Sequence, residues 1–396
     1  MKVLFLTFYY APDFGPGALR AKALVEALEK RIGKELELDV LTTMPHRFGS
    51  CVDDAPESET CNSGRIKRMP IKYNNSGILK QVFAFAAYAV GVFRLVRGKK
   101  YDLVIVSSSR LMTAALAARI AQRCRAPLYL DIRDLFLENL MQIFAYKPLR
   151  LILPFVRIIE RYIINKATRI NLISRGFLPY AKKNWGFRDY HFFTNGVDEM
   201  FCQNVSLQNT QAQVPIILYA GNFGYAQALH RIVPQAAKKL EGKVRFVLIG
   251  DGACKKNLID KLRQLEVTNV ELLPVVPREK LLPYYEKADI LFLHLNEMQS
   301  LKHVIPSKLF EYAATGKRIL AGSSGFTADF MHKNINGIKT FTPCDVDALL
   351  EAIDVLLLYP IFFNRKEFCR QFSRISIMED MVNDIADCIY TKPNSL

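Results

Sequence analysis

Short apolar runs alternate with amphipathic helical patterns along this 396-residue chain, and the alternation occurs twice. An apolar run of strand length that is followed by a helix and then by another such run is typical of a parallel sheet with helices on both faces. The sequence therefore predicts an α/β protein with two doubly wound, Rossmann-like domains. The runs that predict strands are residues 3–8, 38–42, 103–107, 128–132 and 170–173 in the first half, and residues 216–220, 244–249, 270–273, 290–293 and 318–321 in the second.

A polar segment without periodicity, residues 203–213, separates the two series and is typical of a linker. Because 396 residues exceed the size of one ordinary domain, we expect an N-terminal domain over residues 1–205 and a C-terminal domain over residues 206–360. Helices within residues 361–396 are expected to cross back to the first domain. Parallel sheets of this kind bind ligands at the carboxyl ends of their strands, so we expect the two domains to face a central cleft.

The first half of the chain is strongly basic. Residues 1–205 carry 31 Lys and Arg against 18 Asp and Glu, whereas residues 206–396 carry 23 against 20. The basic residues concentrate in residues 65–100 and 141–183. Such an excess indicates an anionic partner. Nucleic acid is not expected as that partner, because the sequence has no zinc-finger spacing, no helix-turn-helix and no interleaved aromatic–basic motif.

Apolar helical patterns at residues 81–93 and 149–164 lie inside these basic stretches. Neither is expected to span a bilayer, which needs about 20 apolar residues. An apolar helix with basic flanks can instead lie on an anionic membrane surface, and the alternative is an interior helix with solvated ends. Two such helices in one basic domain favour a protein bound peripherally to the inner face of the cytoplasmic membrane.

Cysteine and histidine usage favours a cytoplasmic protein without a metal centre. The eight cysteines form no C-x-x-C pair, and the six histidines show no spacing typical of metal ligands. Scattered free thiols are typical of the reducing cytosol. The apolar residues that follow Met1 are expected to form a first buried strand rather than a signal peptide.

One segment of the second half predicts a loop, a helix, a tight turn and a buried strand. Pro306 and Ser307 are typical of a helix start, and Gly316 is typical of a helix end. The backbone N–H groups of a helix start favour an anion, and Lys308 adds a full positive charge there. Glu311 lies one turn further on the same face, where it can accept hydrogen bonds from sugar hydroxyls. This pattern suits a nucleotide sugar, and the alternative is an ordinary surface Lys–Glu pair, worth about 0.3 kcal/mol.

Glycines follow the first predicted strand. Gly15 and Gly17 let the backbone approach a phosphate or a sugar, and the next helix points its N-terminus there. A dinucleotide fingerprint would need a third Gly where Arg20 stands, and an acid after the second strand, so NAD is not expected. A later strand is followed by Arg133 and Asp134, and polar residues at that end of a strand are candidates for a functional site. The alternative is a pair that caps the following loop.

The second domain opens with a strand that leads into a glycine loop. Asn222 of this loop can donate to a phosphate or accept a sugar hydroxyl. Residues 250–252 form a second glycine turn, for which a structural role is the favoured interpretation. Asp345 and Asp347 have the spacing of a metal–nucleotide motif, but their place at a helix start favours N-capping. The sequence therefore predicts no metal site.

The order of these motifs resembles that of GT-B glycosyltransferases in the large retaining family 4, above all of the bacterial enzymes that build O-antigen, capsule and exopolysaccharide. Each phrase is weak alone, but together they occur in family order and at family spacing. The supporting phrases are residues 11–20, 131–135, 173–177, 194–198, 219–222, 249–252, 276–279 and 306–312.

The resemblance implies that the C-terminal domain binds a nucleotide sugar and that the N-terminal domain binds the acceptor. The implied reaction transfers a hexose or N-acetylhexosamine from a UDP-linked donor to a lipid-linked glycan, with retention of anomeric configuration. No metal is implied, and no cofactor besides the donor substrate. Because no carboxylate pair is evident as acid and nucleophile, stabilisation of the leaving diphosphate is expected to dominate catalysis.

The resemblance also implies roles for individual residues. Lys308 is the implied stabiliser of the leaving group, and Arg133 and Asp134 are implied to lie near the reacting sugar, with Arg133 where many members carry a His. Glu311 matches the carboxylate that holds the ribose hydroxyls. The other implied donor contacts are the base-binding edge Val276 and Arg278, the helix start Ser307, Lys308 and Leu309, the glycine turn Gly15 and Gly17, and Asn222.

The chain departs from the family pattern in two places. His303 stands eight residues before Glu311, where many members carry the first Glu of a Glu-x7-Glu pattern. His303 and Gly17 are therefore the candidates for contacts with the transferred sugar. Asn222 and residues 226–227 stand where members carry the Arg and Lys of a diphosphate clamp, so the helix start must carry more of the phosphate charge.

Two other functions stay open at this point. A UDP-sugar 2-epimerase can share the GT-B architecture, but it needs acid and base carboxylates in the cleft and no membrane-facing helices. A catalytically inactive glycosyltransferase-like subunit is the second alternative, and the missing first Glu favours it. Release of nucleoside diphosphate from a sugar donor would exclude the inactive subunit.

Overall fold

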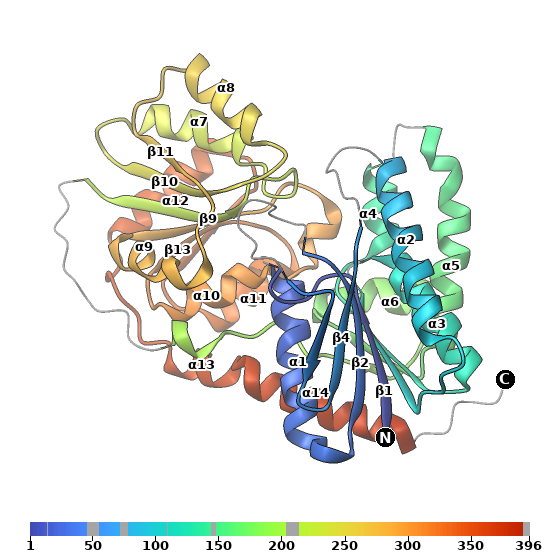
Figure 1. Cartoon of the computed structure of the whole chain (residues 1–396). Coiled ribbons are helices and arrows are strands. Elements are labelled where there is room, and N and C mark those ends of the chain that lie inside the picture. The colour runs from blue at the N-terminus through green and yellow to red at the C-terminus, as the bar shows by residue number, and fades with distance from the viewer. Residues whose placement is uncertain are drawn as a thin grey trace. The chain divides into compact units, whose positions relative to one another are not determined.

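The computed structural model describes residues 1–13, 15–45, 55–71, 78–108, 110–143, 148–202 and 214–390. The chain divides into two compact units, which Figure 1 shows in colours from blue to red along the sequence. Unit 1 comprises Met1–Asn195 and Ile375–Leu396, and unit 2 comprises Gly196–Arg374. Each unit is built on a largely parallel sheet with helices against it, which confirms the predicted α/β class with two parallel-sheet domains.

Within the described residues, the sheet of unit 1 has eight strands in the order β3-β4-β2-β1-β5-β6-β7-β8. Neighbouring strands pair in parallel, except that β3 pairs antiparallel with β4 at the edge. The central strands are continuous apolar runs because helices cover both of their faces. The strands are β1 (Lys2–Thr7), β2 (Glu37–Thr43), β3 (Ser58–Cys61), β4 (Gly64–Met69), β5 (Leu103–Ser108), β6 (Leu128–Ile132), β7 (Arg169–Leu172) and β8 (Tyr190–His191).

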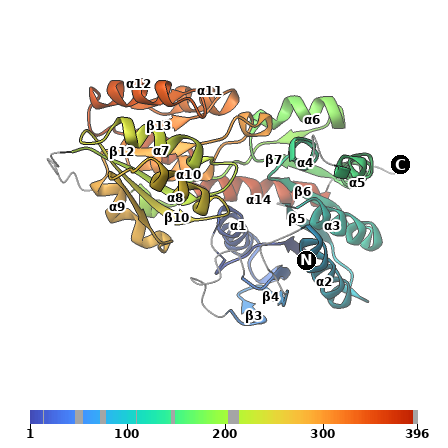
Figure 2. The same cartoon turned by 90° about the horizontal axis from the view of Figure 1, so that it is seen from above.

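Helices α1 (Pro16–Ile32) and α14 (Arg374–Tyr390) cover one face of this sheet, where Phe5, Leu24 and Met381 share a core. Helices α2, α3 and α5 lie together on the other face (Figures 1 and 2). The remaining bounds in unit 1 are α2 (Ile78–Val96), α3 (Leu111–Cys124), α4 (Phe136–Ile143), α5 (Leu153–Lys166), α6 (Leu178–Trp185) and the 3-10 helices η1 (Gly33–Glu35), η2 (Pro148–Ile152) and η3 (Arg175–Phe177).

The sheet of unit 2 is parallel throughout the described residues, in the order β11-β10-β9-β12-β13-β14. Successive residues of a strand point to opposite faces, so Ile217 and Leu218 of β9 enter two separate cores. The strands are β9 (Ile216–Asn222), β10 (Arg245–Asp251), β11 (Val270–Leu273), β12 (Ile290–His294), β13 (Arg318–Gly322) and β14 (Ile338–Phe341). The helices are η4 (Glu199–Phe201), α7 (Leu229–Lys239), α8 (Lys255–Gln264), η5 (Arg278–Leu281), α9 (Leu282–Lys287), η6 (Gln299–Lys302), α10 (Ser307–Ala314), α11 (Phe326–Asn334), α12 (Val346–Leu357) and α13 (Lys366–Gln371).

The first boundary between the units lies before the expected boundary at residue 205. Val197 and Phe201 are buried in a core of unit 2, and the Val197 N–H donates to the Phe372 carbonyl at 2.8 Å. The packing of these side chains therefore assigns the segment to unit 2, ahead of the polar stretch. The expected linker, residues 203–213, lies outside the described residues.

The second boundary divides the helices of residues 361–396, which we expected to cross back to the N-terminal domain. Helix α13 stays with unit 2, because Phe368 packs against Phe310 of α10 with ring centroids 6.1 Å apart. Helix α14, beyond Arg374, belongs to unit 1, where its apolar face packs with α1. The chain thus returns to unit 1 only with its last helix.

Part of the basic excess of the first half is neutralised inside unit 1. Arg65 and Lys99 pair with the buried Asp39 at 2.6 and 2.9 Å, and the buried Arg68 pairs with Glu59 at 2.7 Å. The charged residues of β4 hide its strand character in the sequence, which is why we did not expect this strand. Among the described helices, none is both long enough and apolar enough to cross a membrane.

Candidate functional site

Helix α10 begins after a loop at the carboxyl end of the unit 2 sheet, as the sequence predicts. Pro306 has φ −61° and ψ 132° and precedes Ser307, the first helical residue. Leu309 and Tyr312 are fully buried, so the apolar face of the helix fixes its place on the core. Ser307 and Lys308 lie half-buried at the helix start, where the first backbone N–H groups have no partner inside the helix.

Glu311 is the centre of a hydrogen-bonded group at this helix start. Lys308 Nζ donates to its Oε2 at 2.8 Å, and the Tyr285 hydroxyl donates to the same oxygen at 3.3 Å. Arg278 Nε donates to Oε1 at 2.8 Å. The Glu311 side chain is only 8% exposed. The Lys–Glu spacing of the sequence is therefore a half-buried ion pair and not an ordinary surface pair.

The environment of Glu311 keeps its carboxylate charged. Burial alone raises the pKa of Glu311, but the charges of Lys308 and Arg278 outweigh burial and lower the pKa to about 2. Burial, together with the nearby Glu311 charge, raises the pKa of Tyr285 well above its ordinary value, so this hydroxyl stays a donor. The cluster thus presents an ionised acceptor next to a cation, which suits a ligand with vicinal hydroxyls and an anionic group.

Arg278 does not point freely from the loop that we expected to bind a base. Its Nη1 contacts Asp198, and its guanidinium lies over the Phe201 ring at 4.6 Å. Arg374 Nε donates to Asp198 Oδ1 at 2.5 Å. Val276 packs against the unit 2 core just before η5. A role of Val276 and Arg278 in base binding stays a prediction.

Two glycine turns lie side by side where β9 and β10 end. Asn222 pairs in register with Asp251, and its Nδ2 donates to Gln227 Oε1 at 3.2 Å. Gly250 has φ +152°, and a Cβ there would lie 1.9 Å from the Gly221 carbonyl oxygen. The close approach of the two strand ends therefore requires a glycine, which agrees with the structural interpretation of residues 250–252. Asn222 itself is exposed.

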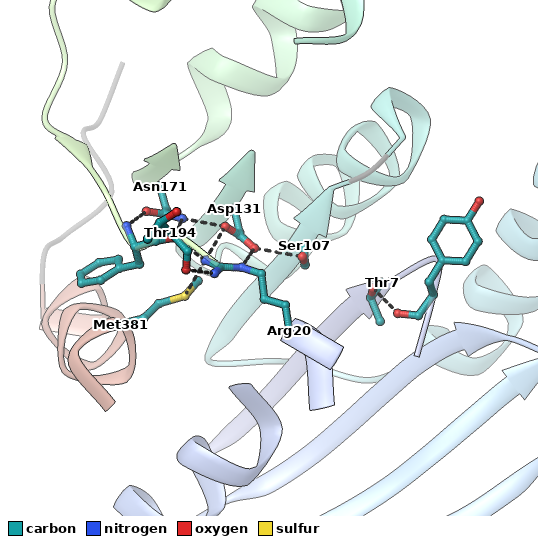
Figure 3. Close-up of polar contacts among 9 residues, drawn as sticks. Thr7, Arg20, Ser107, Asp131, Asn171, Thr194 and Met381 are labelled. Carbon is teal, nitrogen blue, oxygen red and sulfur yellow. Dashed lines mark hydrogen bonds and ion pairs between the residues drawn. The ribbon is translucent and has the colours of Figure 1, made fainter. Parts of the chain in front are cut away.

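A buried polar network lies at the carboxyl ends of β5, β6 and β7 in unit 1 (Figure 3). Arg20 of α1 donates from Nε and Nη2 to the two oxygens of Asp131, at 2.9 and 3.0 Å. Ser107 Oγ and Asn171 Nδ2 donate to the same carboxylate at 2.9 and 2.7 Å. Burial raises the pKa of Asp131, but Arg20 outweighs it and lowers the pKa below its ordinary value. Arg20 thus stabilises the fold at the position where a dinucleotide fingerprint has its third Gly.

Gly17 and Arg133 are neighbours in unit 1. A Cβ on Gly17 would lie 2.4 Å from Arg133 Nη1, so the absence of a side chain at residue 17 makes room for the guanidinium. Gly15 precedes α1 with φ +147°, a conformation that L side chains rarely adopt. Arg133 and Asp134 are half-buried just after β6. Their contact with a reacting sugar stays a prediction, as does that of the glycine turn with a donor.

His303 lies in the short segment between η6 and α10 and is half-buried. Its backbone N–H donates to the Ser300 carbonyl at 3.4 Å. The residue therefore precedes the helix that carries Glu311, with Pro306 between them. A contact of His303 with the transferred sugar stays a prediction.

Among the residues that the structure describes, no three or more His, Cys, Asp or Glu side chains gather in a group that could hold a metal ion. Asp345 caps α12, with its Oδ1 accepting from the Ala348 N–H at 3.0 Å, which confirms the N-cap interpretation. Asp347 instead pairs with Lys239 at 2.7 Å.

Sequence reasoning missed three members of the Glu311 group: Tyr285, Asp198 and Arg374. Asp198 was part of a phrase that supported the resemblance, but no role followed from it. The Arg374–Asp198 contact joins residues 176 positions apart, and neither periodicity nor spacing carries a signal over that separation. An Asp shortly before a buried aromatic residue was the available hint.

Family comparisons agree with the two-unit architecture. Residues 17–196 match the model described as "Glycosyl transferase 4-like domain", and residues 207–375 match "Glycosyl transferases group 1". This chain is built from two glycosyl transferase domains. The first match corresponds to the N-terminal segment of unit 1, and the second corresponds to unit 2, each to within one residue at its C-terminal end. No curated protein matches the sequence of this glycosyl transferase significantly.

Solved structures of GT-B glycosyltransferases share the fold along nearly the whole chain. Sucrose-phosphate synthase from Thermosynechococcus elongatus has a TM-score of 0.72 at 14% identity, over 98% of this chain and 99% of that chain. Anabaena HepE in complex with UDP-glucose has a TM-score of 0.71 at 14% identity, over 98% and 100%. WaaG, a glycosyltransferase involved in lipopolysaccharide biosynthesis, has a TM-score of 0.62 at 13% identity, over 99% and 98%. At such identities the likeness establishes the fold alone.

Proposed function

We propose that this protein is a retaining GT-B glycosyltransferase of cell-surface polysaccharide biosynthesis. It transfers a hexose or N-acetylhexosamine from a UDP-linked donor to a lipid-linked glycan. The observation that carries the proposal is the group at the start of α10, where the buried, ionised Glu311 lies 2.8 Å from Lys308. The HepE structures with UDP and glucose and with UDP-glucose support a nucleotide sugar as the donor class.

In this proposal the start of α10 binds the donor. The backbone N–H groups of Ser307 and Lys308 and the Lys308 ammonium receive the diphosphate, because fixed donors and a helix N-terminus stabilise developing negative charge. Leu309, which we expected to contribute as well, donates its N–H to the Pro306 carbonyl at 3.0 Å. Glu311 accepts hydrogen bonds from the ribose hydroxyls. Asn222, the last residue of β9, contacts the phosphate, and His303, in the segment before α10, contacts the sugar. Arg133 and Asp134 of unit 1 assist at the reacting sugar. The reaction needs no metal and no further cofactor.

The acceptor side of the proposal rests on the outer face of unit 1. Phe83 of α2 is 72% exposed and Phe155 of α5 is 68% exposed, although both belong to helices rich in apolar residues. A groove of about 680 Å³ runs along α5. Its lining is Met141, Arg150, Leu153, Pro154, Arg157, Ile158 and Arg161. Apolar side chains among arginines suit an anionic lipid surface, so the protein is peripheral on the cytoplasmic face of the membrane.

The activity is tested by release of nucleoside diphosphate from UDP- and GDP-sugars, with and without a polyprenyl-linked glycan extract. One donor is expected to release its diphosphate in a lipid-dependent manner, and the anomeric configuration of the product is expected to match that of the donor. Equilibration of a UDP-sugar with its 2-epimer would instead establish the epimerase. Failure of every donor–acceptor pair would favour the inactive subunit.

Lys308→Ala tests the leaving-group role directly. Loss of a fixed donor to the departing diphosphate is expected to lower kcat by about 10²-fold. Lys333→Ala, an exposed Lys of α11 in the same unit, is the matched control and is expected to keep kcat unchanged. An unchanged rate in Lys308→Ala would remove this residue from the mechanism.

A further inference from the structure

The two oxygens of Glu311 are held from different sides. Oε1 accepts from Arg278, whose side chain is 14% exposed, and Oε2 accepts from Lys308, whose side chain is 27% exposed. Lys308 is thus the more accessible of the two cations. Arg278 is enclosed between Glu311, Asp198 and the Phe201 ring.

Asp198, the partner of Arg278, lies where the two segments through which the chain enters and leaves unit 2 pair with each other. Asp198 follows Gly196, the first residue of the unit, and Arg374 is the last residue before the chain leaves. The Val197 N–H donates to the Phe372 carbonyl at 2.8 Å, and the Arg374 N–H donates to the Val197 carbonyl at 2.9 Å. The two segments therefore form a short paired ladder that fixes Asp198.

Close packing makes this ladder rigid. A Cβ on Gly196 would lie 2.4 Å from the Arg374 Cα, so the two backbones touch without an intervening side chain. The Arg374 side chain is 6% exposed and donates to both oxygens of Asp198, at 2.5 and 3.3 Å. The two hydrogen bonds from Arg374 therefore fix the orientation of the Asp198 carboxylate, which also contacts Arg278.

The charges of these contacting residues indicate which cation can leave its carboxylate for another anion. Arg374, Arg278 and Lys308 face the two carboxylates of Asp198 and Glu311. If Lys308 turns to another anion, the two arginines still balance the two carboxylates. If Arg278 were lost instead, Glu311 would depend on Lys308 for its positive partner, and a turn of Lys308 to another anion would leave a buried carboxylate unpaired, which is costly.

We propose that Asp198 and Arg278 are positioning residues that hold the Glu311 carboxylate for the ribose of the donor, while Lys308 leaves Glu311 and pairs with the diphosphate. This assignment rests on the proposed function, in which the start of α10 binds a nucleoside diphosphate sugar. No covalent bond changes in this exchange. The Lys308 ammonium leaves the Glu311 carboxylate and pairs with the diphosphate. Arg278 and the Tyr285 hydroxyl keep their hydrogen bonds to Glu311.

The proposal separates two parts of donor binding. Recognition of the ribose hydroxyls depends on Arg278 and Asp198, and recognition of the diphosphate depends on Lys308. A ligand that lacks the hydroxyls but keeps the diphosphate distinguishes the two parts. The probes are UDP, GDP and ADP, each compared with its 2′,3′-dideoxy counterpart, and the measured quantity is the ratio of the two dissociation constants.

The test is calorimetric titration of the full-length wild type, Arg278→Met, Asp198→Asn and Lys308→Ala with these pairs. The wild type is expected to bind one diphosphate about 10-fold more tightly than its dideoxy form, as loss of a hydrogen bond to a charged group predicts. Arg278→Met and Asp198→Asn are expected to bring this ratio close to one while dideoxy binding stays unchanged. Lys308→Ala is expected to weaken both ligands about 10-fold and to keep the ratio.

Controls separate a positioning role from a folding defect. Glu271→Gln removes another Arg–carboxylate pair of unit 2, the exposed one with Arg245, and is expected to bind like the wild type. Arg278→Lys keeps the charge but cannot reach both carboxylates, so it replaces Arg278→Met if that variant does not melt cooperatively. It is expected to lower the ratio as well.

The possible outcomes separate failure of the proposed function from failure of the positioning role. A wild type that binds none of the three diphosphates overturns the proposed function and this inference with it. A wild type that binds, with the ratio unchanged in both Arg278 variants, overturns the inference alone. A ratio that collapses in Lys308→Ala as far as in Arg278→Met also overturns it, because ribose recognition would then depend on Lys308.

Discussion

His294 and Glu311 are buried titratable residues of unit 2 whose pKa values both lie below their ordinary values, for different reasons. Burial lowers the pKa of His294 to about 4. Its Nε2 accepts from the Cys344 N–H at 3.0 Å, so Nδ1 carries the proton and donates to the Gln227 carbonyl at 2.7 Å. A second proton would break the Cys344 contact. The pKa of Glu311 falls to about 2 because neighbouring cations outweigh burial.

Both shifts make the folded state sensitive to acid. Between pH 6.5 and 4 the unfolded chain binds a proton at His294 that the folded chain does not, so unfolding becomes easier as the pH falls. The loss is about 3 kcal/mol over this window, since one pKa unit corresponds to about 1.4 kcal/mol. Glu311 adds a further loss between pH 4.5 and 2. The free energy of unfolding, measured with denaturant at pH values from 7.5 to 4, is expected to depend less steeply on pH in His294→Gln than in the wild type. Parallel curves would contradict the assignment.

Gly17 and Arg133 provide a second prediction at the level of single residues. The Cβ of Gly17→Ala would lie 2.4 Å from Arg133 Nη1, so the flexible guanidinium must move aside. We expect transfer activity to fall in Gly17→Ala while the melting temperature changes little. Gly17→Ala displaces the Arg133 guanidinium, and Arg133→Ala removes it. The effect of Gly17→Ala on activity is therefore expected to vanish in an Arg133→Ala background. Additive losses in the double variant would show that Gly17 acts independently of Arg133.

At the level of elements, α14 is the segment whose place most depends on contacts distant in sequence. Its buried face packs with α1, and Asp384 accepts from the Tyr129 hydroxyl at 2.8 Å and from Arg169. His191 Nδ1 lies 3.1 Å from the same carboxylate. One acidic residue thus ties the last described helix to the strands β6, β7 and β8.

Removal of this carboxylate is expected to loosen α14. Asp384→Ala leaves the Tyr129 hydroxyl and the Arg169 guanidinium without their acceptor, which is expected to cost about 3 kcal/mol in the free energy of unfolding. Amide hydrogen exchange is expected to rise throughout α14 and to stay low in α10. Glu379→Ala, which removes the exposed pair of the same helix with Lys30, is the control and is expected to change the free energy by less than about 1 kcal/mol. Equal effects of the two variants would refute an anchoring role of Asp384.

At the scale of the whole molecule, charge divides unequally between the two halves of the chain. Acidic partners neutralise some of the basic residues of unit 1, as Asp39 does for Arg65. Arg150, Arg157 and Arg161 on α5 and the helix before it are exposed and form no ion pair in the described part of the chain. Exposed apolar residues flank these arginines, so this face has the composition of a membrane-binding surface.

Vesicle binding tests this surface. The protein is expected to sediment with phosphatidylglycerol-containing vesicles and not with pure phosphatidylcholine vesicles, and added salt is expected to weaken binding. Replacing Arg150, Arg157 and Arg161 with Ala is expected to lower binding about 100-fold, since each basic residue near an anionic surface contributes about 1 kcal/mol. The matched control replaces Lys256, Lys261 and Arg263 of α8, which removes the same charge from unit 2. Equal losses of vesicle binding in both triple variants would show that binding depends on net charge and not on this surface.

Features that depend on short-range order could be predicted from the residues alone. Apolar runs of strand length predicted the two parallel sheets, and helix-start residues predicted α10. The Lys308–Glu311 contact was also within reach, because a helix brings residues three positions apart onto one face. Local periodicity and local hydrogen bonding are encoded over a few residues and can be read without a fold.

Contacts between residues distant in sequence became visible only in the folded chain. In the sequence, Arg20 was notable only because it occupies the position of the third Gly of a dinucleotide fingerprint. In the structure it is the buried partner of Asp131. Arg278 was expected at a base-binding edge, yet its guanidinium lies between Asp198 and Glu311. Burial makes such pairings selective, because a charge removed from water must find its partner wherever the chain supplies one. Tertiary packing determines which residue becomes that partner, and local sequence patterns carry no information about it.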